Sequence, residues 1–252
     1  MNMNKYSLVL SGGGALGYAH LSVIEEIEKF IIDKPSELIG TSMGAIIAAS
    51  LATGRPLKET KEILKANKNI FNLIGFSSLS TKSIISEEKI DKLLSEYFFD
   101  LDFKSLSTPL KVIATNLETG EKEVFSKENN VPVKDAVMAS ISLPILFKPK
   151  SINGIKYIDG AFSSNCAIEE ASEKQAIVSD VLGDKSYTRY KDISSVETAM
   201  RIMISNQTKV KLKQNKKFHY INIDCHNTRT SDFHKIDKIF NYGYGYIPKL
   251  NL

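Results

Sequence analysis

Residues 40–44 read Gly40-Thr41-Ser42-Met43-Gly44, which has the form G-x-S-x-G. The apolar pair 38–39 predicts the end of a buried strand just before it, and the apolar run 45–52 predicts a buried helix just after it. A serine on such a sharp strand-to-helix turn is a nucleophile elbow, in which Gly40 and Gly44 let strand and helix approach closely. The helix dipole also favours negative charge beside the serine. Ser42 is therefore the candidate nucleophile, and an ordinary tight turn is the alternative.

The composition is that of one globular domain. The chain has 252 residues, of which 42% are hydrophobic and 25% charged, and its net charge of +4 is mild. Such a charge permits contact with an anionic surface but gives no reason to expect nucleic acid binding. No run approaches the ~18–20 apolar residues of a membrane span. Residues 1–10 show no secretory signal, so we expect a cytoplasmic protein.

The sequence predicts neither a metal site nor a cofactor. The two cysteines, Cys166 and Cys225, are far apart, which indicates free thiols in a reducing compartment. The histidines show no H-E-x-x-H spacing. They are His20, His219, His226 and His234.

A glycine-rich loop follows the first predicted strand. Residues 6–11 are rich in Leu and Val, residues 12–17 read Gly-Gly-Gly-Ala-Leu-Gly, and an amphipathic helix follows from Ala19. With the strand before the elbow, this order predicts a right-handed βαβ unit. Gly12, Gly14 and Gly17 also match the dinucleotide pattern G-x-G-x-x-G. That site requires an acidic residue after the second strand, where this chain has the elbow instead.

The glycine loop has a second interpretation, as an oxyanion hole. Adjacent parallel strands end at the same edge of a sheet, so the N–H groups of Gly12, Gly13 and Gly14 can point at an oxygen beside Ser42. Only glycines let a backbone approach that closely. Two neighbouring strand-to-helix turns would then supply the nucleophile and the hydrogen-bond donors, and we prefer this interpretation.

A serine nucleophile also needs a base. A hairpin predicted over residues 152–158 delivers Asp159-Gly160-Ala161, and a carboxylate at the end of a core strand can serve as that base. The competing interpretation of Asp-Gly is a turn. The competing base is His226, which follows an apolar strand predicted over residues 218–224. Hydrolases with that Ser…Asp…His order normally carry the elbow after several strands, whereas here it follows the second.

Taken together, the three motifs resemble the signatures of the patatin-like phospholipase family. They have matching order and spacing, and the resemblance extends over about residues 6–180, including the stretch 139–144 and Asn165. The positions that carry it are Gly12, Gly14, Gly17, Gly40, Gly44, Asp159, Gly160 and Ala161.

The resemblance implies an α/β fold, a three-layer α/β/α sandwich with a mainly parallel central sheet, as one domain over residues 1–252. It implies a Ser42–Asp159 dyad, an acyl-enzyme intermediate and hydrolysis of phospholipids or other acyl-ester lipids. Two positions depart from the family. Leu16 stands where many members carry Arg or Lys, so a cation that could hold a phosphate is missing. Cys166-Ala167 stands where a Pro-Val-like pair is common.

Two further stretches bear on the substrate. Residues 70–85 have no clear period and predict either a loop folded onto the core or an apolar flap over the site. Residues 209–217 carry five lysines, which suit either a solvated helix end or an anchor for anionic lipid head groups. Any membrane contact is expected to be peripheral.

Two other classes of function stay open at this stage. An acyltransferase could use the same dyad with an alcohol or thiol in place of water. A nucleotide-binding or regulatory protein could keep the glycine loop alone.

Overall fold

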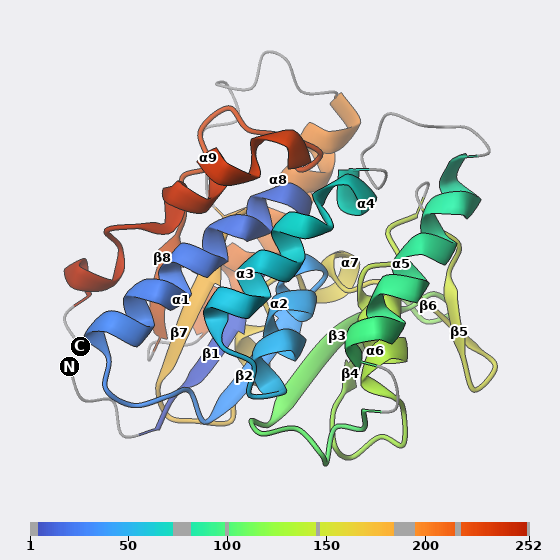
Figure 1. Cartoon of the computed structure of the whole chain (residues 1–252), viewed down its shortest axis with the longest axis horizontal. Coiled ribbons are helices and arrows are strands. Elements are labelled where there is room, and N and C mark those ends of the chain that lie inside the picture. The colour runs from blue at the N-terminus through green and yellow to red at the C-terminus, as the bar shows by residue number, and fades with distance from the viewer. Residues whose placement is uncertain are drawn as a thin grey trace.

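The computed structural model describes residues 5–72, 82–98, 101–144, 147–183, 195–214 and 218–250, and it shows one central sheet flanked by helices (Figure 1). Within these residues the sheet has eight strands in the order β5-β6-β3-β2-β1-β7-β8, and β4 also pairs with β3. The strands are β1 (Ser7–Leu10), β2 (Glu37–Thr41), β3 (Leu110–Asn116), β4 (Lys122–Phe125), β5 (Lys150–Ile152), β6 (Ile155–Asp159), β7 (Ala176–Asp180) and β8 (Phe218–Asn222).

The sheet is mainly parallel, as the sequence predicts. Strands β3, β2, β1, β7 and β8 run parallel to one another. Strands β4 and β6 pair antiparallel with β3, and β5 pairs antiparallel with β6. The parallel strands therefore end at one edge of the sheet, where ligands of open α/β sheets bind.

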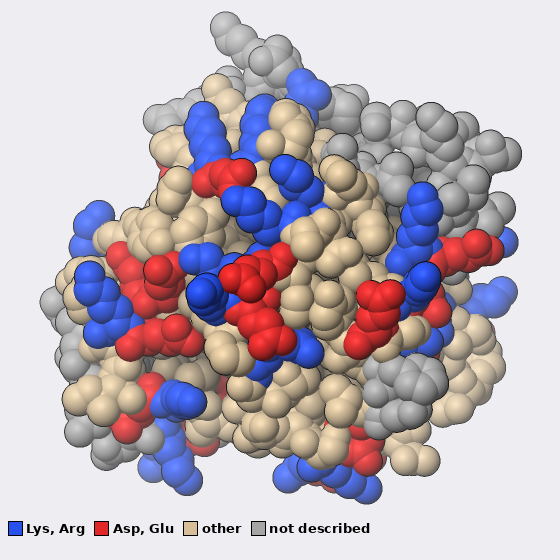
Figure 2. All heavy atoms as spheres, viewed as in Figure 1, with Lys and Arg blue, Asp and Glu red and all other residues tan. Residues whose placement is uncertain are grey.

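Helices cover both faces of this sheet. Figure 1 shows α1, α2 and α3 in front of it, and Figure 2 shows basic and acidic side chains intermixed on this face of the molecule. The α-helices are α1 (Ala19–Phe30), α2 (Met43–Ala52), α3 (Leu57–Ala66), α4 (Lys68–Asn72), α5 (Lys82–Phe98), α6 (Val133–Ser140), α7 (Ala161–Ser164), α8 (Ser195–Gln214) and α9 (Ile236–Phe240). None of the helices in the described part of the chain has the length and apolar composition of a membrane span.

Two hydrophobic cores explain why the sheet is covered on both sides. In each central strand, alternate residues belong to different cores, as in β3, where Val112 and Ala114 lie in one and Ile113 in the other. The smaller core also packs against Leu212 of α8. A strand buried on both faces reads as a continuous apolar run, which is the pattern of these strands. The three-layer α/β/α prediction is confirmed.

The stretch 70–85, predicted as a loop or a flap, is partly helical. The helix α4 ends at Asn72 and α5 begins at Lys82. Residues 73–81 lie outside the described part of the chain, and the flap hypothesis for them stays a prediction.

A buried histidine joins the ends of β1 and β7 behind the glycine loop. His20 Nε2 donates to the carbonyl of Ser11 at 2.9 Å, and Nδ1 lies 2.8 Å from Ser179 Oγ. The Ser11 carbonyl can only accept, so Nε2 carries the proton and Nδ1 accepts from the hydroxyl. Burial lowers the pKa of His20 to about 4, against a smaller opposing effect of the Ser11 bond. The neutral ring is therefore part of the folded structure at neutral pH.

This histidine should make the fold sensitive to acid. Between pH 6.5 and 4 the unfolded chain binds a proton at residue 20 and the folded chain does not, so the free energy of unfolding falls as the pH falls through that window. Across the whole window, the loss in the free energy of unfolding is on the order of 3 kcal/mol. Urea unfolding of the wild type and of His20→Gln across this range should show a steeper loss for the wild type. The difference between the two unfolding free energies at each pH removes the contribution of groups that titrate alike in both proteins. If the two proteins lost stability in parallel as the pH falls, this assignment of His20 would be contradicted.

Candidate active site

Ser42 occupies the turn between β2 and α2 with a backbone conformation that side chains rarely adopt. Its φ is 53° and its ψ is −122°. A non-glycine residue held there costs of order 1–3 kcal/mol. A Cβ on Gly40 would lie 2.5 Å from the carbonyl oxygen of Gly44, and a Cβ on Gly44 would collide with the backbone of Leu10. Glycines at both positions thus permit the elbow, and Ser42 is left partly exposed.

The carboxylate of Asp159 lies directly beside this serine. Ser42 Oγ donates a hydrogen bond to Asp159 Oδ2 at 2.7 Å, across 117 positions of sequence. The other oxygen, Oδ1, accepts the N–H of Ala161 at 2.9 Å. Asp159 is the last residue of β6, and its neighbour Gly160 packs against the carbonyl of Ile113 in β3. The structure therefore brings together the nucleophile and the base predicted from sequence.

Burial gives Asp159 the properties of a base near neutral pH. Desolvation raises the pKa of Asp159 from 3.8 to about 6, against smaller opposing effects of the hydrogen bonds from Ala161 and Ser42. A base is most effective when its pKa lies near the operating pH. At pH 7 this carboxylate is ionised, and it is also more basic than an exposed aspartate.

The histidine alternative does not fit the geometry. His226 is exposed, its Nδ1 lies 3.6 Å from Asp224, and its ring packs edge-on against Tyr242 with centroids 5.0 Å apart. All four histidines lie in the described residues, and none of them hydrogen-bonds to Ser42. The hydroxyl has an aspartate as its partner.

The glycine loop lies against the nucleophile, with one departure from the expected roles. A Cβ on Gly12 would lie 2.6 Å from Asn165 Oδ1 and 3.0 Å from Ser42 Cβ, so the loop reaches the site only as backbone. The N–H of Gly12, however, donates a long hydrogen bond to the carbonyl of Asn165 at 3.4 Å. Within the described chain the N–H groups of Gly13 and Gly14 have no such partner, so these two remain the candidate donors.

The remaining motif positions support the loop and the elbow. Gly17 lies against the side chain of Met43, the residue after the nucleophile. Leu16 is fully buried and supplies no cation to the site. Cys166 and Ala167 are buried in the smaller core, and both cysteines are free thiols, as predicted.

Sequence reasoning missed the contacts made by the end of α6. Ser140 Oγ accepts the N–H of Ser42 at 2.8 Å and donates to the carbonyl of Ile113 at 2.6 Å. The carbonyl of Ser142 accepts the N–H of Asp159 at 3.0 Å. The stretch 139–144 resembled the family in sequence, but no local pattern shows which group a buried serine binds.

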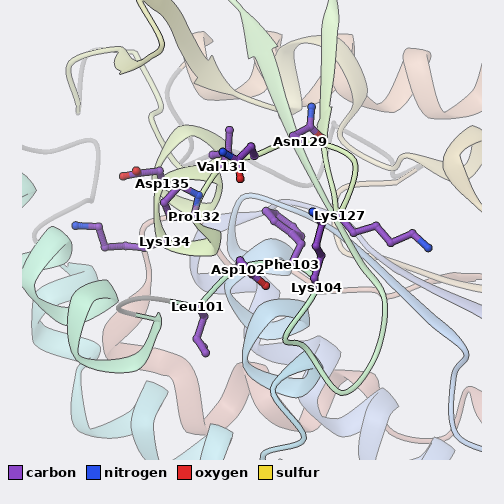
Figure 3. Close-up of a pocket in the computed structure, with 11 residues that line it drawn as sticks. Leu101, Asp102, Phe103, Lys104, Lys127, Asn129, Val131, Pro132, Lys134 and Asp135 are labelled. Carbon is purple, nitrogen blue, oxygen red and sulfur yellow. The ribbon is translucent and has the colours of Figure 1, made fainter.

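The structure also has a hollow of about 470 Å³, whose lining residues are drawn in Figure 3. It is lined by residues 101–104, 127, 129–132 and 134–135 and includes neither Ser42 nor Asp159. Two of its charged side chains have partners outside it, Lys134 with Asp91 and Asp135 with Lys150. The described residues contain no cluster of side chains suited to a metal ion.

The chain is similar in sequence to known proteins. The family model for patatin-like phospholipases matches residues 8–172. An uncharacterised NTE family protein of Mycobacterium tuberculosis is 30% identical over 158 residues, which are 62% of this chain and 42% of that protein. The cUMP-AMP-activated phospholipase of Escherichia coli is 29% identical over 181 residues, covering 63% of this chain and 55% of that enzyme.

A solved structure gives the same fold. VipD from Legionella pneumophila matches with a TM-score of 0.50 and 13% identity, covering 96% of this chain and 66% of VipD. This chain spans about half the length of the curated relatives that it matches.

The raised pKa of Asp159 predicts how Ser42 reactivity depends on pH. A fluorophosphonate probe should label Ser42 at a rate that rises about tenfold per pH unit below pH 6 and levels off above pH 7, because only the ionised carboxylate takes the proton. Labelling rates measured by mass spectrometry, with circular dichroism at each pH as the control for folding, check this. An inflection near pH 4 would contradict the assigned environment.

Proposed function

The chain belongs to the patatin-like phospholipase family, and from this premise we propose that it is a lipid acyl hydrolase with Ser42 and Asp159 as its catalytic dyad. The observation that carries the proposal is the 2.7 Å hydrogen bond between Ser42 Oγ and Asp159 Oδ2 at a strained elbow. The family model spans both residues. We also propose that residues 1–252 act as one domain.

The first half of the reaction is acylation of Ser42. Asp159 Oδ2 accepts the proton of Ser42 Oγ while that oxygen attacks the ester carbonyl. The N–H groups of Gly13 and Gly14 hold the oxyanion, and each such donor is worth about 2.7–4 kcal/mol. The proton then passes from Asp159 to the leaving alcohol, and the acyl group stays on Ser42.

The second half restores the enzyme. Asp159 accepts a proton from water, which attacks the acyl carbonyl, and the same two N–H groups hold the second oxyanion. The fatty acid leaves and the proton returns to Ser42 Oγ. An added alcohol in place of water would give acyl transfer, so product analysis with and without such an acceptor separates the two activities.

The substrate proposed for this site is an acyl-ester lipid recognised mainly by its ester and acyl chain. Leu16 is buried and contributes no cation for a head-group phosphate. Next to Asp159, α7 presents Phe162 with a partly exposed ring. Apolar surface beside the dyad suits an acyl chain.

We further propose that the exposed face of α7 and α8 meets the lipid surface. Met203 is 62% and Val210 56% exposed on α8, and Gln207 of the same helix donates to the carbonyl of Phe162 at 2.9 Å. Between residues 198 and 208 the sole charged side chain is Arg201, which is buried. The outward side of α8 is therefore uncharged there, as expected of a face that enters a lipid interface.

Of the lysines in the stretch 209–217, Lys211 is engaged within the protein and Lys213 is exposed. Lys211 points inward, where it forms an ion pair with Glu169 at 2.7 Å and bonds to Ser164. Lys213 is exposed and lies beyond the apolar face. It stays available to anionic head groups, at ~1 kcal/mol for each lysine near such a surface. Residues 215–217 lie outside the described part of the chain.

Removing either member of the dyad should abolish hydrolysis of acyl-ester lipids. Ser42→Ala removes the nucleophile, and Asp159→Asn keeps the shape but not the basicity, so a panel of phospholipids and lysophospholipids should give at least a ~10³-fold loss in each variant. Circular dichroism should show an unchanged fold. Full activity of Asp159→Asn would refute the dyad, and full activity of Ser42→Ala would refute the serine mechanism.

Placing a charge on α8 should weaken activity on vesicles alone. Met203→Glu replaces an apolar contact worth roughly 1.5–3 kcal/mol when buried, so binding to anionic vesicles should fall ten- to hundredfold. Hydrolysis of a soluble short-chain ester should not change. The matched control is Ile32→Glu, since Ile32 is 81% exposed after α1. An equal effect of both variants, or a change in the apparent size of the protein with Met203→Glu alone, would argue for a different occupant of this face.

A further inference from the structure

Ser140 links the elbow to the neighbouring strand. It is the last residue of α6 and is fully buried. Its Oγ accepts the N–H of Ser42 at 2.8 Å and donates to the carbonyl of Ile113 at 2.6 Å. Ile113 lies opposite Thr41 in the parallel register of β2 and β3. The hydroxyl thus joins the two strands one residue beyond the end of their ladder.

Neither the strand ladder before Ser42 nor the helix after it provides a hydrogen-bond acceptor for the Ser42 N–H. The β2–β3 pairing ends at Thr41, and the first hydrogen bonds of α2 use the carbonyl of Ser42, which accepts from Ala45 and Ile46. At its positive φ, Ser42 donates its N–H to Ser140 Oγ instead. A partly buried N–H left without a partner is costly, so the Ser140 hydroxyl favours the strained conformation over a relaxed one.

The same segment holds the carboxylate. The carbonyl of Ser140 accepts the N–H of Gly160 at 3.4 Å, and the carbonyl of Ser142 accepts that of Asp159 at 3.0 Å. Strands β2 and β6 are not neighbours, because β3 lies between them. Residues 140–142, the end of α6 and the turn after it, therefore hydrogen-bond to the backbone at both halves of the proposed dyad.

We propose that Ser140 is a positioning residue that fixes the separation of Ser42 Oγ and Asp159 Oδ2 through its hydrogen bond to the Ser42 N–H. The inference rests on the proposed function only in treating Ser42 as the reactive group. Without the hydroxyl the elbow relaxes toward an ordinary backbone conformation and moves Oγ away from its base. Reactivity falls, while the surfaces that bind the acyl chain are unchanged.

The test compares Ser140→Ala with a matched loss of another buried hydroxyl. Ser50 lies on α2, eight residues after the nucleophile, and its buried Oγ lies 2.8 Å from Thr60 Oγ1. Ser50→Ala should cost similar stability without touching the elbow. For both variants, the maximal rate and the apparent affinity of fluorophosphonate labelling, kcat and KM on a soluble short-chain ester, and the melting temperature are measured.

Ser140→Ala should lower the maximal labelling rate and kcat at least about tenfold, since small displacements of a reacting group have effects of that size or larger, and should leave KM within about twofold. Ser50→Ala should match the wild type in labelling rate, kcat and KM, although its melting temperature is lower. Ser140→Thr keeps the hydroxyl and should recover part of the rate, whereas Ser140→Cys, a poorer acceptor, should not. If Ser140→Ala does not fold, the Thr and Cys pair carries the comparison.

Equal labelling rates for Ser140→Ala and Ser50→Ala, or for Ser140→Thr and Ser140→Cys, would overturn the positioning role. This outcome is distinct from failure of the proposed function. If the wild type is labelled at Ser42 but hydrolyses no lipid, the substrate is wrong and the role of Ser140 is still tested by labelling. If the wild type is not labelled, the dyad itself fails.

Discussion

The site depends on one hydrogen bond between residues 117 positions apart, from Ser42 to Asp159. Strand β2, which ends just before Ser42, and strand β6, which ends at Asp159, are not adjacent. A third strand therefore has to set the positions of both residues along the sheet. Strand β3 does so, because Thr41 pairs with Ile113 on its parallel side and Asp159 pairs with Ala114 on its antiparallel side. Consecutive residues of β3 therefore place Ser42 and Asp159, the proposed nucleophile and base, at the same level of the sheet.

This placement depends on the pairing register of β3. The hydrophobic pattern of the strand determines that register. Val112 and Ala114 belong to one core and Ile113 to the other. A slip of one residue would move each of these side chains to the opposite face of the sheet, away from the core that it fills. The two cores thus fix the strand, and the strand fixes the dyad. Packing on both faces of β3 thus helps to hold Ser42 Oγ within hydrogen-bond distance of Asp159.

Local patterns predicted most of this architecture, because each motif needs only a few neighbouring residues. The glycines at 40 and 44 and the apolar runs around them predict the elbow, and the order of strands predicts a parallel sheet. The contacts that sequence could not give are those in which a polar group has several possible partners. The Ser140 hydroxyl, the N–H of Gly12 and the ammonium group of Lys211 each bind a group distant in sequence. Which one they bind follows from tertiary packing.

The same packing explains why one buried carboxylate is kept basic. Burial raises the pKa of Glu37 as well, but Lys111, at 2.8 Å, together with hydrogen bonds from Ser172 and Ser7, brings it below the usual value. Glu169 is likewise held by two lysines. Asp159 receives only hydrogen bonds from neutral groups and forms no ion pair within the described residues, so desolvation prevails and its pKa rises to about 6. A lysine beside Asp159 would lower its pKa, as Lys111 does for Glu37. Asp159 has no such cation among the described residues, and its raised pKa is the property that the proposed proton transfer from Ser42 requires.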